Sequence, residues 1–235
     1  MSGPLPSEFT MPSLTPSVIH QHPDFVVVVK PAGVHFHSQD GNAGLVAQLE
    51  AQLNESLYPV HRLDTPTSGL LVLARHPAAA ATLTALFTAH QVEKRYLALS
   101  GHKPKKKQGT VKGGMAKARR GAWKLTPGQE NWAITQFVSH NLRPGIRAFL
   151  LRPRSGRTHQ IRVALKSLGA PILGDALYGG SDADRTYLHA WSLGFDWQGQ
   201  WQQFWLAPQQ GEQWGEELAP LLAQWQQDDP AWPKG

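Results

Sequence analysis

The chain has 235 residues, a formal net charge of +6 and no cysteine. This length suits one large domain or two small ones, and 41% apolar residues with nine tryptophans can build a substantial core. The absence of cysteine excludes disulfides, thiolate catalysis and Cys-type zinc sites. A net positive charge favours a polyanionic partner such as nucleic acid, although charge alone leaves a basic protein without such a partner equally open.

The N-terminal segment, residues 1–19, is rich in Pro and Ser. It lacks the basic start and the apolar centre of a secretion signal, so we expect a flexible tail on a cytoplasmic protein. No apolar stretch approaches the roughly 20 residues that a membrane helix needs. The remaining chain shows no linker and no internal repeat, and we expect it to form a single domain over residues 20–235.

Apolar runs and turn residues predict many strands and few helices along the chain. We expect strands at residues 24–33, 68–75, 92–100, 133–140, 146–154 and 186–195, and one more within 197–208. We expect helices at residues 45–57, 76–91 and 157–169, and a polar helical tail at the C-terminus. Many strands with few helices between them predict an α+β domain around a largely antiparallel sheet.

The positive charge is concentrated in residues 101–120, which read GHKPKKKQGTVKGGMAKARR. This segment contains eight Lys or Arg residues and no acidic residue. Its glycines and proline argue against a helix, so we expect an exposed, mobile basic loop that is inserted into the domain. Such a loop is suited to condensing onto the phosphates of a nucleic acid.

One carboxylate, Asp64, stands in the segment HRLDTPTSG just before the apolar run LLVLA. Loops at the ends of rigid strands often hold reactive groups. An isolated Asp in a turn, however, more often caps the turn or pairs with a neighbouring cation, here Arg62. Asp64 taken alone therefore does not distinguish a catalytic site from an ordinary turn.

Three further segments add candidate groups. Tyr96 lies in the strand-like segment KRYLAL beside two cations, where a tyrosine is more often part of the core. In RSGRTHQIRVAL, Arg154, Arg157 and Arg162 make a cationic patch suited to phosphate beside a helix start, although a polar helix stripe is usually solvated. Lys30 begins the segment KPAGVHFH at the end of an expected strand.

Other chemistries lack the residues that they need. Ser68 does not stand in a Gly-x-Ser-x-Gly nucleophile elbow, and no Gly-x-x-x-x-Gly-Lys phosphate loop occurs. Two His-x-His pairs, in residues 20–22 and 35–37, have no acids at a spacing that would complete a metal site. Glycoside hydrolysis usually needs two carboxylates, and Asp175 in LGDALYG is better explained as a turn residue.

The segments HRLDTPTSGLLV, KRYLAL, RSGRTHQIRVAL, GAPILGDALYG and LHA occur in this order between residues 24 and 191. Together they resemble the RluA family of RNA pseudouridine synthases, and the first segment is highly specific. The resemblance implies the pseudouridine synthase fold, with a mixed, mostly antiparallel central sheet, flanking helices and a central cleft. It also implies isomerisation of specific uridines in structured RNA, ribosomal or transfer, without a cofactor or a metal.

The resemblance also implies roles for individual residues. Asp64 would be the catalytic carboxylate, Arg162 would pair with it, and Tyr96 would stack on the target base and help to remove the C5 proton. Arg62 matches the residue proposed to fill the gap left by the flipped base. The weaker matches, which we expect to line the RNA cleft, are His61, Lys30, Arg157, His159 and Gln160. For each of them, packing or a phosphate contact is as open as direct participation in the chemistry.

Many members of that family carry an S4 RNA-binding module, which we do not expect here because only about 20 residues precede the first expected strand. We therefore expect the basic loop to supply part of the RNA grip, so that neutralising Lys105, Lys106 and Lys107 weakens binding and flattens its salt dependence. The competing hypotheses are an RNA-binding protein or chaperone without the chemistry and, third, a metal-dependent nuclease. We expect a monomer with no obligate protein partner and no membrane association.

Overall fold

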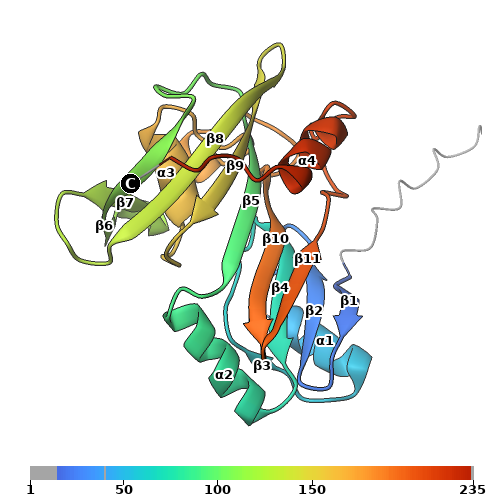
Figure 1. Ribbon diagram of the computed structural model, residues 1–235. Helices are drawn as coiled ribbons and strands as arrows, with labels where there is room; N and C mark the ends of the chain where they lie inside the picture. Colours follow the sequence, from blue (N-terminus) through green and yellow to red (C-terminus); the bar gives the residue numbers. More distant parts are fainter. Residues whose placement is uncertain (1–14, 40, 234–235) are drawn as a thin grey trace, which may run out of the picture.

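The structure is a computed structural model and describes residues 15–39 and 41–233 (Figure 1). Its helices are α1 (Leu45–Leu53), α2 (Pro77–Thr88), α3 (Gln160–Ser167) and α4 (Leu218–Gln227), with the short 3-10 helices η1 (Arg119–Gly121) and η2 (Ala176–Tyr178). Its strands are β1 (Ser17–Gln21), β2 (Phe25–Lys30), β3 (Tyr58–Pro59), β4 (Ser68–Ala74), β5 (Glu93–Ser100), β6 (Gln108–Lys117), β7 (Trp123–Thr126), β8 (Ala133–Arg143), β9 (Ile146–Pro153), β10 (Leu188–Trp197) and β11 (Gln200–Trp205). Within the described part of the chain, no helix is long and apolar enough to span a bilayer.

The strands form one mixed sheet in the order β1-β2-β4-β10-β5-β9-β8-β6-β7, with β11 beside β10 and β3 beside β4. The pairs are antiparallel except for β4 and β10, which are parallel. In that pair Gly69 lies opposite Ala190 with a φ of +117°, and a Cβ at Gly69 would come 2.3 Å from the Ala190 carbonyl oxygen. Only glycine fits there, so the segment HRLDTPTSG ends at a fixed point in the middle of the sheet. The predicted α+β fold with a mixed, mostly antiparallel sheet is confirmed.

The N-terminal half of the sheet is buried on both faces. β4 is buried along its whole length and β2 along nearly all of it, because successive side chains point to opposite faces and a helix packs near each face. On one face Val27 packs in the same cluster as Leu83 of α2. On the other face Val28 packs in the same cluster as Leu45 of α1.

The other half of the sheet is covered by α3 and α4. α4 buries Leu218, Leu222 and Trp225, which fall on one face at helical spacing. These residues share a cluster with Ile161 and Leu165 of α3 and with apolar residues of β5, β8 and β9. The buried side of α3 is thereby held against this half of the sheet, beside β7, β8 and β9.

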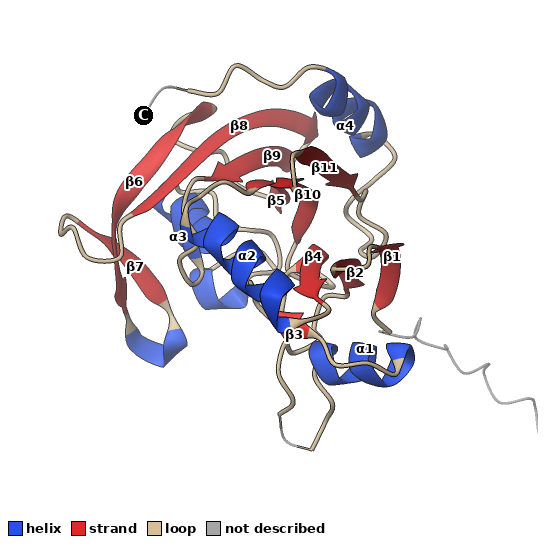
Figure 2. Cartoon of the chain, turned by 60° about the horizontal axis from the view of Figure 1, so that its bottom comes forward, coloured by secondary structure: helices blue, strands red, loops and turns tan. Residues whose placement is uncertain are grey.

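Half of the basic segment is strand β6, the first strand of a β-hairpin, so the prediction of a basic loop over residues 101–120 is wrong for residues 108–117 and holds for residues 101–107. β6 pairs with β8 along one edge, and its residues 114–117 pair with β7. The glycines that suggested a loop allow close backbone approach, since a Cβ at Gly114 would come 2.3 Å from the Gly128 carbonyl oxygen. Figure 2 shows the β6–β7 hairpin extending away from the rest of the sheet.

The boundaries of several elements differ from the expected ones. Ser17–Gln21 pair with β2 as strand β1, so the expected tail over residues 1–19 is wrong at its C-terminal end; residues 1–14 lie outside the described residues. α1 ends at Leu53 because Asn54 adopts the left-handed conformation, with a φ of 53°. α2 starts at Pro77, where the side chain of His76 accepts a hydrogen bond from the Ala79 amide.

The packing of α2 gives a first prediction. Leu83 is 0% exposed, so Leu83→Ala should lower the free energy of unfolding by about 2–5 kcal/mol through lost burial and a residual cavity. Thr84 is exposed on the same helix, and Thr84→Ala should change it by less than about 0.5 kcal/mol. Urea unfolding followed by circular dichroism measures both values. Equal effects of the two substitutions would contradict the packing described for α2.

Candidate active site

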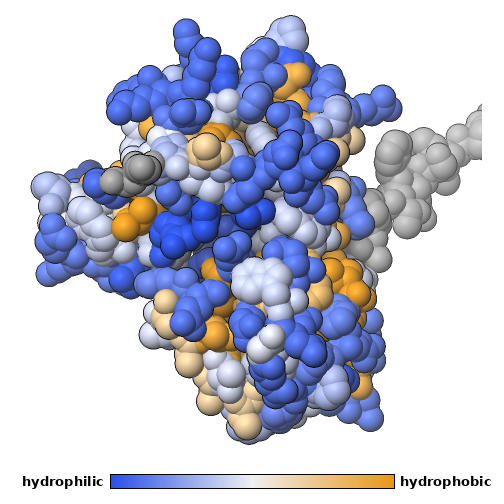
Figure 3. Space-filling view, in the orientation of Figure 1, coloured by the Kyte–Doolittle hydropathy of each residue, from blue (hydrophilic) through white to orange (hydrophobic). Residues whose placement is uncertain are grey.

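A cleft of about 530 Å³ lies between the C-terminal end of α2, strand β5 and the start of α3. In the space-filling view, strongly hydrophilic side chains gather across the middle of this face, between α3 and α2 (Figure 3). Eight of the nine predicted site residues line this cleft: His61, Arg62, Asp64, Tyr96, Arg157, His159, Gln160 and Arg162. The fold therefore brings together residues that are far apart in the sequence.

Lys30 is the exception, because its side chain is 0% exposed beneath the loop that carries Asp64. Its ammonium group donates to the carbonyl oxygens of Pro31, Thr65 and Thr67 at 3.0, 2.9 and 2.8 Å. The Thr67 amide in turn donates to the carbonyl oxygen of Asp64 at 3.0 Å. The prediction that Lys30 lines the RNA cleft is therefore wrong: its ammonium group instead fixes the backbone that directly follows Asp64, the carboxylate of the cleft.

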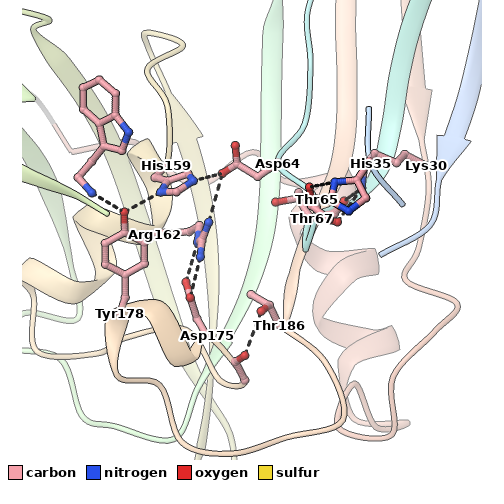
Figure 4. A network of polar contacts seen from close by, with 12 residues as sticks. Lys30, His35, Asp64, Thr65, Thr67, His159, Arg162, Asp175, Tyr178 and Thr186 are labelled. Carbon is pink, nitrogen blue, oxygen red and sulfur yellow. Dashed lines mark hydrogen bonds and ion pairs between the residues drawn. The ribbon is translucent and has the colours of Figure 1, made fainter. Parts of the chain in front are cut away.

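The Asp64 side chain is 21% exposed and faces two nitrogen-bearing groups of α3 and its cap (Figure 4). Its Oδ2 lies 3.7 Å from Nη1 of Arg162 and 3.9 Å from Nε2 of His159. These separations place both groups around the carboxylate without a direct hydrogen bond. The carboxylate thus remains open to a ligand in the cleft.

Arg162 is 5% exposed and is oriented by a second acid, Asp175, which is 1% exposed. Nε and Nη2 of Arg162 donate to the two oxygens of Asp175 at 2.7 and 2.8 Å. This bidentate ion pair leaves Nη1 of Arg162 directed toward Asp64. The interpretation of Asp175 as a turn residue is incomplete: its carbonyl oxygen does accept bonds from the amides of Tyr178 and Gly180, but its side chain holds Arg162.

Tyr96 stands in β5 with Ala190 on one neighbouring strand and Leu151 on the other. Its side chain is half-buried and reaches the cleft. Burial, reinforced by the charge of Asp64, raises the pKa of Tyr96 above its ordinary value of 10. Tyr96 is therefore a neutral phenol at neutral pH, able to stack on a base and to donate or accept a hydrogen bond.

Two of the expected RNA-contacting residues support the wall of the cleft. His61 is half-buried, accepts a hydrogen bond from the Val72 amide at 3.0 Å and stacks on Phe87 at 4.3 Å. Burial, with the charge of Lys94, lowers its pKa to about 3, so the ring is neutral. Gln160 is 5% exposed, and its amide group bonds to four partners in residues 134–135, 155 and 157.

Cations at the rim complete the cleft. Arg62 and Arg157 line the cleft and are exposed. Lys94, one of the two cations beside Tyr96 but not among the predicted site residues, lies half-buried at the cleft with its ammonium group 5.9 Å from the Phe87 ring centroid. Burial lowers the pKa of Lys94 to about 8. Strand alternation puts Lys94 and Tyr96 on the same face, which is the sequence signal that points to it. The described residues contain no group of three or more His, Asp or Glu placed to hold a metal ion.

Comparison with known proteins identifies the family of this chain. The family model for RNA pseudouridylate synthase matches residues 24–167. The chain belongs to that family. It is 48% identical over 200 residues to an uncharacterized RNA pseudouridine synthase of Haemophilus influenzae, and the match covers 84% of this chain and 89% of the relative. The predicted RluA-type pseudouridine synthase, an isomerase acting on RNA, is thereby confirmed.

Further relatives agree with this assignment. The chain is 32% identical to the ribosomal large subunit pseudouridine synthase D of Zymomonas mobilis, with 76% of this chain and 64% of the relative covered. The solved structure of human RNA pseudouridylate synthase domain containing 1 superposes with a TM-score of 0.70 at 25% identity, covering 83% of this chain and 84% of the other. Human RNA pseudouridylate synthase domain containing 4 gives a TM-score of 0.64 at 26% identity, with 82% and 88% covered.

The buried position of Lys30 has a consequence for the pH dependence of stability. Burial lowers the pKa of Lys30 from 10.5 to about 7, so between these pH values the unfolded chain binds more protons than the folded chain. The free energy of unfolding should therefore gain up to about 1.4 kcal/mol per pH unit from this lysine as the pH rises through that range. The variant Lys30→Met lacks this contribution, and its stability should rise less steeply than that of the wild type.

Urea unfolding at several pH values between about 7 and 10 measures this difference in slope. Lys103 is exposed, and Lys103→Met serves as the matched variant that should follow the wild type. Parallel curves for wild type and Lys30→Met would show that Lys30 does not titrate in this range.

Proposed function

We propose that this pseudouridine synthase isomerises a uridine of structured RNA at Asp64, with Tyr96 and Arg162 as the other two catalytic residues. The observation that carries the proposal is the placement of a partly exposed carboxylate in a cationic cleft, with a neutral phenol on the same wall. A cleft of about 530 Å³ falls in the size range of small-molecule sites and can accept an everted nucleotide.

The reaction is an internal exchange of bonds. The bond from uracil N1 to ribose C1′ breaks, the base turns, and a bond forms from C5 to C1′. The C5 proton is lost and N1 gains a proton, so the product is an isomer of the substrate. Because no water has to be activated and the uracil stays bound, one carboxylate suffices, whereas glycoside hydrolysis usually uses two.

Each residue then has a physical task. Asp64 either attacks or stabilises the sugar or the base as the glycosidic bond breaks, and Arg162 orients it from 3.7 Å. Tyr96 stacks on the everted base and assists removal of the C5 proton. Arg62, exposed at the rim, takes the place that the base leaves in the RNA stack, since its planar head can stack on neighbouring bases.

The substrate that we propose is ribosomal RNA. The relatives named as ribosomal large subunit synthases support this choice. Transfer RNA is the second candidate, because both RNAs present uridines in folded, partly unstacked regions that base flipping can reach. We further propose that the enzyme acts in the cytoplasm as a monomer.

The catalytic role of Asp64 is tested by release of tritium from C5 of uridine. The substrate is RNA labelled with 5-tritiated uridine in cells that lack this protein. Asp64→Asn keeps the size of the side chain and removes its charge, so the rate should fall at least about a hundredfold while RNA binding persists. Asp182 is exposed, and Asp182→Asn should release tritium at the wild-type rate. Equally little release by wild type and Asp64→Asn, with equal RNA binding, would favour a binding protein without the chemistry.

The β6–β7 hairpin offers a second cationic surface for RNA. Arg119, Arg120 and Lys124 are exposed around its turn, and the backbone of Trp123 beside them bonds to Tyr178 next to the cleft. Residues 105–107 lie at the opposite end of β6, where the Lys105 amide bonds to the Leu168 carbonyl oxygen beyond the end of α3. The hairpin is therefore connected through Tyr178 to His159, whose Nε2 lies 3.9 Å from Asp64.

Replacing Arg119, Arg120 and Lys124 with Gln should weaken RNA binding and reduce its salt dependence. Each lost phosphate contact should lower the slope of log K against log salt by about 0.7–0.9. The matched variant carries Gln at residues 105–107 and removes the same charge, and we expect a smaller reduction from it. Filter binding across a salt series gives both slopes. A larger reduction of the slope for the 105–107 variant would show that residues 105–107 make most of the phosphate contacts instead.

A further inference from the structure

Tyr178 joins the β6–β7 hairpin to the cleft through one hydroxyl group. Its oxygen accepts a hydrogen bond from the backbone amide of Trp123 at 2.9 Å and lies 2.8 Å from Nδ1 of His159 (Figure 4). The Tyr178 side chain is 5% exposed and packs in a cluster with Met115 of β6 and Val163 of α3. Three separate elements therefore meet at this residue.

The direction of these hydrogen bonds determines which ring nitrogen of His159 carries the proton. The amide of Trp123 can only donate, so it occupies an acceptor site of the Tyr178 hydroxyl and leaves the hydroxyl hydrogen available to donate to Nδ1 of His159. When the hydroxyl donates to Nδ1, the proton of the neutral imidazole is on Nε2, the nitrogen that lies 3.9 Å from Oδ2 of Asp64. Burial lowers the pKa of His159 against the opposing pull of Asp64, which is consistent with a neutral ring.

Tyr178 also contacts the second group that flanks Asp64. The guanidinium of Arg162 lies over its ring, 4.9 Å from the centroid. A cation over an aromatic face is held by the ring's electron density, so the ring supports the same guanidinium that Asp175 orients.

The backbone at His159 is strained, which indicates that its position is enforced by its surroundings. His159 has a φ of 56°, in the left-handed region, at the residue that caps α3. Non-glycine residues in this region cost free energy and persist where neighbouring contacts hold them, commonly at functional sites. The imidazole ring of His159 meets the phenol ring of Tyr178 edge-on, with the ring centroids 5.7 Å apart, so the tyrosine is one of these contacts.

We propose that Tyr178 is a positioning residue of this enzyme: its hydroxyl sets the tautomer and direction of His159, so that Nε2–H faces Asp64, and ties this arrangement to the β6–β7 hairpin. The inference rests on the proposed role of Asp64. The inference adds that the β6–β7 hairpin, which we propose to bind RNA, is hydrogen-bonded through the Trp123 amide to Tyr178. Tyr178 in turn contacts His159 beside Asp64. The position of RNA bound to the hairpin is thereby mechanically linked to the arrangement of the side chains around Asp64.

The test compares Tyr178→Phe with Tyr187→Phe. Tyr187 is a matched control because it is also buried, and its hydroxyl also accepts from a backbone amide, that of Gln213, and donates to Asp184. Tyr187 does not line the cleft. Tritium release from the RNA described above is measured with enzyme in excess, so that the maximal rate reports the chemical step and the half-saturating enzyme concentration reports RNA binding.

Tyr178→Phe should lower the maximal rate about tenfold, equivalent to about 1.4 kcal/mol, and leave half-saturation within about twofold of wild type. Tyr187→Phe should keep the wild-type rate. In a His159→Asn background, Tyr178→Phe should cost no further rate, since a residue that acts through His159 has nothing left to position. A wild-type rate for Tyr178→Phe, or an undiminished further loss in the His159→Asn background, would overturn the proposal.

A second readout does not depend on activity. Long-range proton–nitrogen NMR spectra of the histidine rings show which nitrogen carries the proton, and the His159 signals are identified by their absence in His159→Asn. We expect an Nε2–H ring in the wild type and in Tyr187→Phe, and a mixture of tautomers in Tyr178→Phe. Unchanged His159 signals in Tyr178→Phe would overturn the inference. If the wild type released no tritium, the proposed function would fail while this spectrum still decided the effect of Tyr178 on His159.

Discussion

Arg162 is a buried cation shared between two carboxylates, and the geometry of the cleft depends on how it is shared. A buried guanidinium without a partner would cost several kcal/mol, so the ion pair with Asp175 is a condition for folding α3 against the sheet. Because Asp175 takes two nitrogens in a fixed fork, the third is directed at Asp64. The pair also joins α3 to the turn before η2, which carries Tyr178.

A second buried basic side chain fixes the loop that carries Asp64, from the other half of the sheet. Lys30, at the end of β2, bonds three carbonyl oxygens and so determines the path of the backbone around Asp64. Gly69 limits the same loop at its far end, where β4 and β10 approach too closely for a side chain. The side chain of Asp64 is thus oriented from α3, while its backbone is held from β2 and β10. Both supports are internal, which leaves the cleft itself free for RNA.

The strands with long aliphatic runs, such as β2 and β4, could be predicted because burial on both faces leaves a clear apolar pattern. The hairpin of β6 and β7 could not, because its glycines serve backbone contacts between strands and resemble those of a loop. Among the site residues, the three proposed catalytic residues and most of the cleft wall followed from motifs. Lys30 and Asp175 were misjudged, because whether a charge is solvated or buried is set by neighbours distant in the chain.

The sequence alone determined the family, the largely antiparallel α+β fold and the set of reactive residue types, since these reside in local motifs and in apolar periodicity. Only the tertiary structure decided which charges meet. Lys30 finds its carbonyl partners 35 and 37 residues away, and Tyr178 finds the Trp123 amide 55 residues away. The physical reason is that a buried polar group must be satisfied by whatever the fold brings within about 3 Å of it, and that distance is a property of packing.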